Sequence, residues 1–417
     1  MEDDDDSTNK FIDDLIYRDA KCYCRHIGYR SKKPGGCKLG MSAERISQLE
    51  RNDPTLHGLI VNGRDWIKGS GHVFGETTCL YTLNIEDGTG TADRSWLDEL
   101  CRGITHNRSI ESFSLTSWCK SDTDIFGNLF PFLQYNSSLR YIHVSIEHLG
   151  SFATSLSRCQ NGQLEYINVI SRGSTEAEVA TLFGSLNEQP KLTNLSIRMY
   201  RSHAIIDVDG ITILKNALIK HNSVLKLTMR LDLSKEGWKI FASILSHPAC
   251  SILKLEIEAK RVNVIHLARA MAANNSLRHL YVTGVRSPNT SENCWGILHR
   301  ALCDVSSINK TFSSNHTLHE LVVSQELSLQ EEIYDDKPLP SDISSLLDMN
   351  KIEDKAQVAR HKILKFHFTE DKDVHVFART MPLTTMPVAI EWIGRNRTEF
   401  LLMYEVVRSV PALFERL

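Results

Sequence analysis

The sequence predicts an α/β solenoid, a stack of similar helix–strand units, and three observations support this prediction. Residues 267–273 place apolar side chains at helical spacing. Two asparagines follow, and asparagine tolerates the left-handed conformation that often ends a helix. Residues 277–282 then show strand-like alternation. The pattern recurs through most of the chain, and because neither half-unit could bury its apolar face alone, neighbouring units must stack.

An apolar triplet, spaced as in Leu277, Leu280 and Val282, marks the expected strand of each unit. Clear triplets begin at residues 110, 139, 164, 192, 224, 252, 277 and 318, and the first seven are separated by steps of 29, 25, 28, 32, 28 and 25 residues. Two earlier triplets begin at residues 56 and 80. Between them, residues 62–79 are irregular and rich in glycine, so this end is expected to be atypical, as terminal repeats usually are.

Helix-spaced apolar segments precede the triplets, and each ends at a recognisable stop signal. Asn107, Asn136 and Asn222 end three of them, while Pro190 and Pro248 follow two others. A proline just beyond a helix end is a stop signal because it cannot continue the helix. The repeating unit is therefore one helix, one tight turn and one short strand.

Composition limits the class of protein. The chain has 417 residues, of which 41% are apolar and 24% charged, which predicts a folded, soluble protein. A net charge of -3 argues against nucleic acid as a partner held by phosphate contacts, and no apolar run approaches the roughly 20 residues of a membrane span. The acidic start and ten thinly spread cysteines indicate an intracellular, cytoplasmic and reducing location.

The spacing Leu-x-x-x-Leu-x-x-Asn-x-x-Leu-x-x-Leu-x-Leu, carried by residues 100–115, 129–144 and 267–282, resembles the ribonuclease-inhibitor class of leucine-rich repeat. The resemblance extends over about residues 45–325. The asparagine of this pattern is missing before Leu192 and Ile252. What the resemblance implies is a horseshoe, with parallel β-strands on the concave side and α-helices on the convex side.

Four segments are expected. Residues 1–42 form a polar, mostly flexible arm with one short helix over Phe11–Tyr17, and residues 43–324 form the leucine-rich-repeat array. Residues 325–342 read as an exposed acidic loop insertion. Residues 343–417 read as a degenerate last repeat, with a strand over 363–368, followed by a helical C-terminal cap.

The tail that runs from Ala-x-x-Trp-Ile-Gly at residues 389–394 to Arg-Ser-x-Pro-x-Leu-Phe at residues 408–414 resembles the closing segment of leucine-rich-repeat proteins common in diatoms and related algae. Its large apolar residues are Trp392, Ile393, Leu402, Val406, Leu413 and Phe414. We expect them to cover the open end of the array, because an uncapped solenoid end would expose its core. The alternative is an apolar docking site for a partner.

Catalytic motifs are not evident, so neither an enzyme nor a cofactor is expected. The segment 87–91, Asp-Gly-Thr-Gly-Thr, resembles a catalytic aspartate loop or a phosphate cradle, but it occurs once, where a loop between units is expected. His316 and His319 flank a leucine anchor and so face different ways. Three cysteines and one histidine in the arm could bind zinc: Cys22, Cys24, His26 and Cys37. Their spacing is not a usual zinc-site spacing, so the alternative is that the cysteines are free thiols in a flexible arm.

The concave surface holds the candidate binding residues. Strand residues that alternate with the apolar anchors point outward, and rows of them stack at about 4.8 Å from strand to strand. Basic residues at these positions cluster in the middle of the array, with aromatic and histidine residues on either side. The candidate partner-binding residues are Tyr141, His143, Tyr166, Arg198, Lys226, Arg230, Lys254, His279 and Tyr281.

A basic centre with aromatic shoulders favours a non-enzymatic scaffold that binds an acidic, extended protein segment. The simpler interpretation is a solvated sheet face whose charges pair with Glu256 and Glu258. The acidic arm could also fold back onto this centre. Two other classes stay open: a GTPase activator, because Ran GTPase-activating protein has this repeat class, and a ubiquitin-ligase substrate-recognition subunit, although residues 1–42 are too polar and short for an F-box. The partner's identity and the oligomeric state are left open.

Overall fold

Ten strands form one parallel sheet in the computed structural model, which describes residues 41–63, 65–87, 95–117, 125–159, 162–200, 205–259, 262–283, 291–324, 339–352 and 354–367. Within the sheet the strands follow chain order. They are β1 Gly58–Asn62, β2 Thr82–Asp87, β3 Ser112–Ser117, β4 Tyr141–Ile146, β5 Tyr166–Ser171, β6 Asn194–Met199, β8 Lys226–Arg230, β10 Lys254–Glu258, β11 His279–Thr283 and β12 Glu320–Ser324. A separate two-stranded sheet pairs β7 Ile205–Ile206 with β9 Asp232–Leu233.

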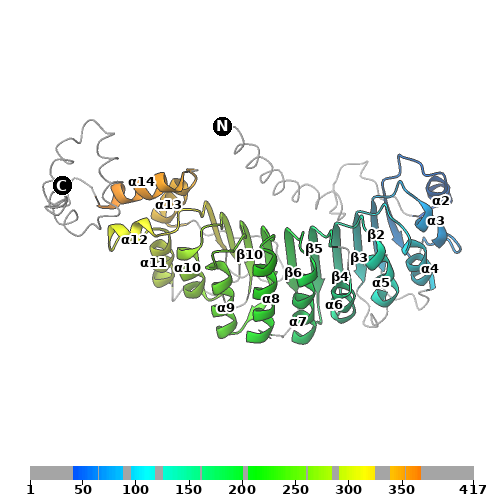
Figure 1. Ribbon diagram of the computed structural model, residues 1–417, viewed down its shortest axis with the longest axis horizontal. Helices are drawn as coiled ribbons and strands as arrows, with labels where there is room; N and C mark the ends of the chain where they lie inside the picture. The colour runs from blue at the N-terminus through cyan, green and yellow to red at the C-terminus, as the bar shows by residue number, and fades with distance from the viewer. Residues whose placement is uncertain are drawn as a thin grey trace.

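Helices alternate with the strands and cover one face of the sheet. They are α2 Ala43–Glu50, α3 Gly71–Glu76, α4 Ser95–Ile104, α5 Ile125–Tyr135, α6 Gly150–Ser157, α7 Glu176–Ser185, α8 Val208–His221, α9 Lys235–Leu245, α10 Val264–Ala273, α11 Ser291–Leu302, α12 Ile308–Phe312, α13 Ser341–Asn350 and α14 Lys355–His367. Figure 1 shows helices α4–α11 along the outer edge of the arc and the strands along its inner edge. The predicted α/β leucine-rich-repeat solenoid is confirmed.

The strand anchors form a continuous core between the sheet and the helices. One cluster of buried side chains extends from Met41 to Leu347, and anchors such as Leu255, Leu277 and Leu280 are fully buried. Each helix is paired with the next by its inward apolar face, as the stacking argument requires.

A repeated hydrogen-bond arrangement marks the start of each strand. The carbonyl of the residue just before one strand accepts two N–H groups from the next unit: Tyr81 O accepts from Glu111 N at 2.9 Å and from Ser112 N at 3.0 Å. Glu111 O accepts in the same way from Arg140 N and Tyr141 N. The arrangement continues unit by unit to Arg278 O, which accepts from the last strand's first residues. We call the side chains of these carbonyl-bearing residues the rim of the concave face.

Buried asparagines fix the turn between helix and strand in the regular units. Asn107 is fully buried; its Nδ2 donates to Phe74 O at 2.7 Å and to Thr77 O at 3.0 Å, while its Oδ1 accepts from Ser109 N and Ile110 N. The equivalent residues are Asn136, Asn274 and Asn315. One amide side chain thus satisfies backbone groups of two successive units, which would otherwise be buried without partners.

The units without this asparagine use other side chains. Gln189 takes the position before Leu192, where its Nε2 lies 3.4 Å from Cys159 O. In the unit of β10, His247 Nδ1 accepts from Ala249 N at 3.1 Å. Asn222 is not part of the buried series: it is exposed, has φ 51° and ends α8 in the left-handed conformation.

Helices α3 and α4 pack unusually closely, through glycines. A Cβ on Gly103 would lie 1.7 Å from Gly71 O, and a Cβ on Gly75 would lie 2.4 Å from Gly103 O. The Glu99 carboxylate of α4 accepts from Gly71 N at 3.1 Å at the start of α3. The irregular first units predicted from the sequence are therefore held by backbone-to-backbone contact.

The C-terminal end differs from the prediction in one element. Residues 363–367 belong to helix α14, so the strand expected over 363–368 is wrong. Asp354 Oδ1 accepts from Ala356 N and Gln357 N at the helix start, and Val358, Ala359, Lys362 and Ile363 are buried at helical spacing. A six-residue window showed alternation because it covered only the last turns of this longer pattern.

Several expectations fall outside the described residues. These are the arm with its Phe11–Tyr17 helix and its cysteines, residues 88–91 of the aspartate loop, residues 325–338 of the acidic loop, and the segment 387–414. Ser341 and Asp342 begin α13 rather than ending a loop, and the division into four segments stays a prediction. Within the described ranges, the structure contains no helix that is long and apolar enough to cross a membrane.

Candidate functional site

The sheet brings the predicted site residues onto one face in aligned rows. Parallel pairing sets Tyr141 beside Tyr166, Arg198 beside Arg230, Lys226 beside Lys254, and Lys254 beside His279. Their exposure differs: Tyr141 is 41% exposed, and the others are half-buried. The face separates into a basic centre on β6, β8 and β10, with one shoulder on either side.

The basic centre contains carboxylates as well as cations. Lys254 Nζ lies 3.0 Å from Glu256 Oε1, and Thr228 Oγ1 donates to Glu256 Oε2 at 3.1 Å. Burial acts to raise the pKa of Glu256, but the positive charges of Lys226 and Lys254 outweigh it, so the pKa lies below its ordinary value. Glu256 is therefore ionised and screens part of the positive charge.

The two arginines of the centre have different surroundings. Arg230 Nη2 lies 3.1 Å from Glu258 Oε1, and its guanidinium lies 4.0 Å from the centroid of the Tyr200 ring. Among the described residues, no carboxylate forms an ion pair with Arg198. Burial and then the charge of Arg198 lower the pKa of His143 to about 4, so His143 is neutral at pH 7.

The C-terminal shoulder is an internally bonded cluster. The Tyr281 hydroxyl donates to Glu320 Oε2 at 2.7 Å, and His279 Nδ1 lies 3.0 Å from the same oxygen. Lys254 Nζ lies 4.7 Å from the centroid of the Tyr281 ring. Burial, followed by the contact with Glu320, raises the pKa of Tyr281. Glu320 and Tyr200 are thus part of the site, although the prediction from sequence did not include them.

The N-terminal shoulder is more open. The rings of Tyr141 and Tyr166 lie 6.4 Å apart at an angle of 45°. The Tyr141 hydroxyl lies 3.4 Å from Glu165 Oε2, while Arg140 Nη1 lies 2.9 Å from Glu165 Oε1. Burial, and next the negative charge of Glu165, raise the pKa of Tyr141.

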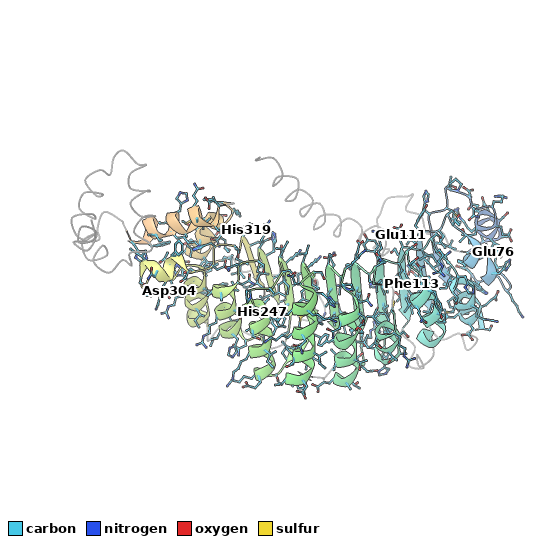
Figure 2. The ribbon with its side chains drawn as sticks, in the orientation of Figure 1. Glu76, Glu111, Phe113, His247, Asp304 and His319 are labelled. Atoms are coloured by element: carbon cyan, nitrogen blue, oxygen red, sulfur yellow. The ribbon has the colours of Figure 1, made fainter. Side chains whose placement is uncertain are left out.

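Two rim residues beside this shoulder were missed. Tyr81 is 44% exposed, and its ring centroid lies 5.8 Å from that of His57. Glu111 lies between Tyr81 and Tyr141 and points to the strand side of the molecule (Figure 2). Rim residues precede the strands, so strand alternation gives no signal for them. Their repeat position, one residue before the first outward residue, could have identified them.

Within the described ranges, no three His, Cys, Asp or Glu side chains are placed to hold a metal ion. The arrangement offers aromatic faces, hydrogen-bonding groups and charges of both signs. These are the components of a recognition surface.

No family model and no curated protein matches the chain. Among solved structures, it is similar to a tropomodulin C-terminal domain from Caenorhabditis elegans, with 14% identity and a TM-score of 0.25, covering 48% of this chain and 89% of that one. It is also similar to the leiomodin-1 actin-binding site 2, with 14% identity and a TM-score of 0.23, covering 49% of this chain and 86% of that one. Similarity this low says nothing about what the present chain binds.

Proposed function

We propose that this protein is a non-enzymatic interaction scaffold of the ribonuclease-inhibitor-like class, and that an extended acidic segment of a protein partner binds across β6, β8 and β10. One observation carries the proposal. Two adjacent cation pairs, Arg198 with Arg230 and Lys226 with Lys254, lie at opposite ends of β8 on three consecutive strands of one sheet.

The charges in this centre do not cancel. Four cationic side chains lie among two carboxylates, those of Glu256 and Glu258. The excess is positive, and Arg198 has no ion-pair partner among the described residues. An arginine held at a sheet surface can bind a carboxylate through two parallel hydrogen bonds, which a partner's Asp or Glu would supply.

The geometry favours an extended segment over a compact one. Side chains in one row are separated by about 4.8 Å from strand to strand, and an extended chain advances about 3.3 Å per residue. Three residue steps of an extended segment, about 10 Å, therefore match the two strand spacings from β6 to β10, so one short segment lying across the strands can reach all three strands. Tyr141 and Tyr166 on one side, and His279 and Tyr281 on the other, add aromatic contacts of the kind that anchor interfaces.

The test compares two triple variants of the full chain. The site variant is Arg198→Glu, Lys226→Glu, Arg230→Glu; the control, on exposed helix positions, is Arg102→Glu, Lys239→Glu, Lys310→Glu. Binding of a labelled polyglutamate peptide is followed by fluorescence anisotropy. We expect the site variant to bind at least about tenfold more weakly than the control, with both folded by circular dichroism. Equal binding by the two variants would exclude the basic centre as the acidic-segment site.

Nothing in the described residues favours the GTPase-activator or ubiquitin-ligase alternatives over a scaffold. A GTP-hydrolysis assay with the wild-type chain examines the first of these directly. If the wild-type chain accelerated GTP hydrolysis by any member of a panel of small GTPases, the scaffold proposal would give way to that activity.

A further inference from the structure

Tyrosine rings on the strand side of this protein differ in whether a cationic side chain of the same chain lies over them. In the C-terminal half, the chain covers them with its own cations: Arg230 lies 4.0 Å from the ring centroid of Tyr200, and Lys254 lies 4.7 Å from that of Tyr281. These distances are typical of cation–π contacts, which attract a positive charge to the negative face of the ring.

The N-terminal half leaves two such rings open. Tyr81 and Tyr141 are 44% and 41% exposed, and within the described part of the chain neither ring has a lysine or arginine over it. Arg140 is the neighbouring cation, but its guanidinium is directed to Glu165, with Nη1 at 2.9 Å from Oε1. The protein therefore supplies the aromatic half of this contact twice without supplying the cation.

A carboxylate lies between the two open rings. Glu111 N donates to Tyr81 O at 2.9 Å, and Tyr141 N donates to Glu111 O at 3.0 Å, so the three residues are on three successive units. None of the described residues forms an ion pair with the Glu111 carboxylate or a hydrogen bond to it. After burial and the effect of Glu165, its negative charge contributes to the raised pKa of Tyr141.

We propose that Tyr81, Glu111 and Tyr141 form a second recognition site, which binds an arginine or lysine side chain from a basic segment of a protein partner. The backbones of Tyr81 and Tyr141 are two strand spacings apart, about 10 Å. A guanidinium or ammonium group between them meets Glu111 as its counter-ion and an aromatic face on each side. We call these three residues the tyrosine site.

The charge of the surrounding surface agrees with this assignment. Over β2–β5 the outward and rim positions carry Glu86, Glu111 and Glu165 against a single cation, Arg140. The basic centre on β6, β8 and β10 has the opposite sign. Resting on the proposed function, the inference gives a bound partner a direction: its acidic part over the centre and its basic part at the tyrosine site.

The test measures binding of a flexible Gly/Ser peptide bearing several arginines to the full-length chain by fluorescence anisotropy. Matched peptides carry citrulline, the uncharged isostere, or glutamate in place of arginine. The site variants are Tyr81→Leu, Tyr141→Leu and Glu111→Gln. The controls are Tyr135→Leu, an exposed tyrosine at the end of α5, and Glu76→Gln, an exposed carboxylate at the end of α3.

We expect the arginine peptide to bind and the citrulline and glutamate peptides not to bind. Each site variant should weaken binding by about threefold to tenfold, and neither control should change it. Equal binding of arginine and citrulline peptides, or equal effects of Tyr141→Leu and Tyr135→Leu, would overturn the proposal.

The two proposed recognition sites can be tested independently of each other. The Arg198→Glu, Lys226→Glu, Arg230→Glu variant should still bind the arginine peptide, and Tyr81→Leu should still bind polyglutamate. If polyglutamate binding is absent and arginine-peptide binding follows the tyrosine site, the basic-centre proposal is wrong and the present one stands. The reverse result retains the basic centre and removes the tyrosine site.

Discussion

The two halves of the strand surface share one backbone and differ in how their side chains are satisfied. From β8 to β12, opposite charges and aromatic rings contact one another: Lys254 meets both Glu256 and Tyr281, and Arg230 meets Glu258. From β2 to β5, Tyr81 and Tyr141 are 44% and 41% exposed, and the carboxylate of the half-buried Glu111 has no ion pair among the described residues. The same register thus produces a surface with many internal ion pairs at one end and a more exposed surface at the other.

This difference affects the cost of binding. A partner of the C-terminal half must compete with existing ion pairs such as Lys254–Glu256, which is half-buried and therefore costs more to break than the about 0–1 kcal/mol of an exposed pair. In the N-terminal half, a cation that binds Glu111 breaks no ion pair of that carboxylate among the described residues, and the Arg140–Glu165 pair can stay in place. The internally bonded half is therefore suited to a selective, charge-matched ligand, and the open half to initial contact.

The largest expected effect tests whether the two halves belong to one rigid frame. Asn107→Ala and Asn315→Ala each remove a buried amide that bonds to four backbone groups, in the N-terminal and C-terminal half respectively. Each should lower the free energy of unfolding by about 3 kcal/mol or more, because the freed backbone groups stay buried. Urea denaturation followed by circular dichroism measures the change.

If the frame is continuous, both variants shift the same single transition. The exposed Asn275→Ala serves as the control and should leave that transition in place. Two separate transitions, each sensitive to only one of the two substitutions, would show that the two halves are separate units that unfold independently.

An intermediate effect concerns the buried lysine at the C-terminal end. Lys362 is fully buried, and its Nζ donates to Leu302 O at 2.6 Å and to Asn315 O at 2.8 Å. Burial, which outweighs the opposing effect of Cys303, lowers its pKa to about 7. A neutral amine has two hydrogens, which match the two carbonyl acceptors.

The unfolded lysine, with a pKa of 10.5, keeps its proton above pH 7 while the folded one has released it. The free energy of unfolding should therefore rise with pH, by about 1–2 kcal/mol between pH 7 and 8.5. Lys362→Met should remove this slope, whereas Lys365→Met, exposed on the same helix, should retain it. The window ends below pH 9 because burial raises the pKa of the Cys303 thiol to about 11, so above pH 9 the folded state keeps a thiol proton that the unfolded state loses, and this cancels the slope from Lys362. A slope unchanged in Lys362→Met would contradict the assignment.

The smallest effect compares one carboxylate from each half. Glu256→Gln loses the ion pair with Lys254 and should cost about 1 kcal/mol of unfolding free energy. Glu111→Gln, with no described partner for its carboxylate, should cost nearly nothing. Thermal unfolding of both variants at pH 7 measures the two losses of unfolding free energy. Equal losses would mean that Glu111 is also satisfied within the fold, which would weaken the tyrosine site.

The sequence was sufficient for the repeat architecture because the apolar triplets recur and a parallel stack leaves one register for them. The same logic located Arg198 beside Arg230 and Lys226 beside Lys254. It could not show which charges pair, since Arg230 divides its contacts between Glu258 and Tyr200, and such choices depend on side-chain conformation across units.

Other features needed a longer sequence window. Asn350 ends α13 and donates to Leu318 O at 2.8 Å, so it continues the buried asparagine series although no strand of the described sheet follows it. Its place at the end of an apolar helix is the signal that was available. Helix α14 was read as a strand because Lys362, a charged residue on the buried face, obscured the helical spacing.

The paired hydrogen bonds at the strand starts have a consequence for how such a protein can change over time. Each rim carbonyl joins two N–H groups of the next unit, so the start of each strand is fixed even though the helix-to-strand connection varies, from four residues between α8 and β8 to eight between α9 and β10. The strand-to-helix side varies as well: four residues separate β5 from α7, and seven separate β3 from α5. Insertions can accumulate on either side of a strand without moving any concave side chain. Individual concave residues can then be substituted while the backbone positions that carry them stay the same. New binding specificities can therefore evolve, or be engineered, without redesigning the scaffold.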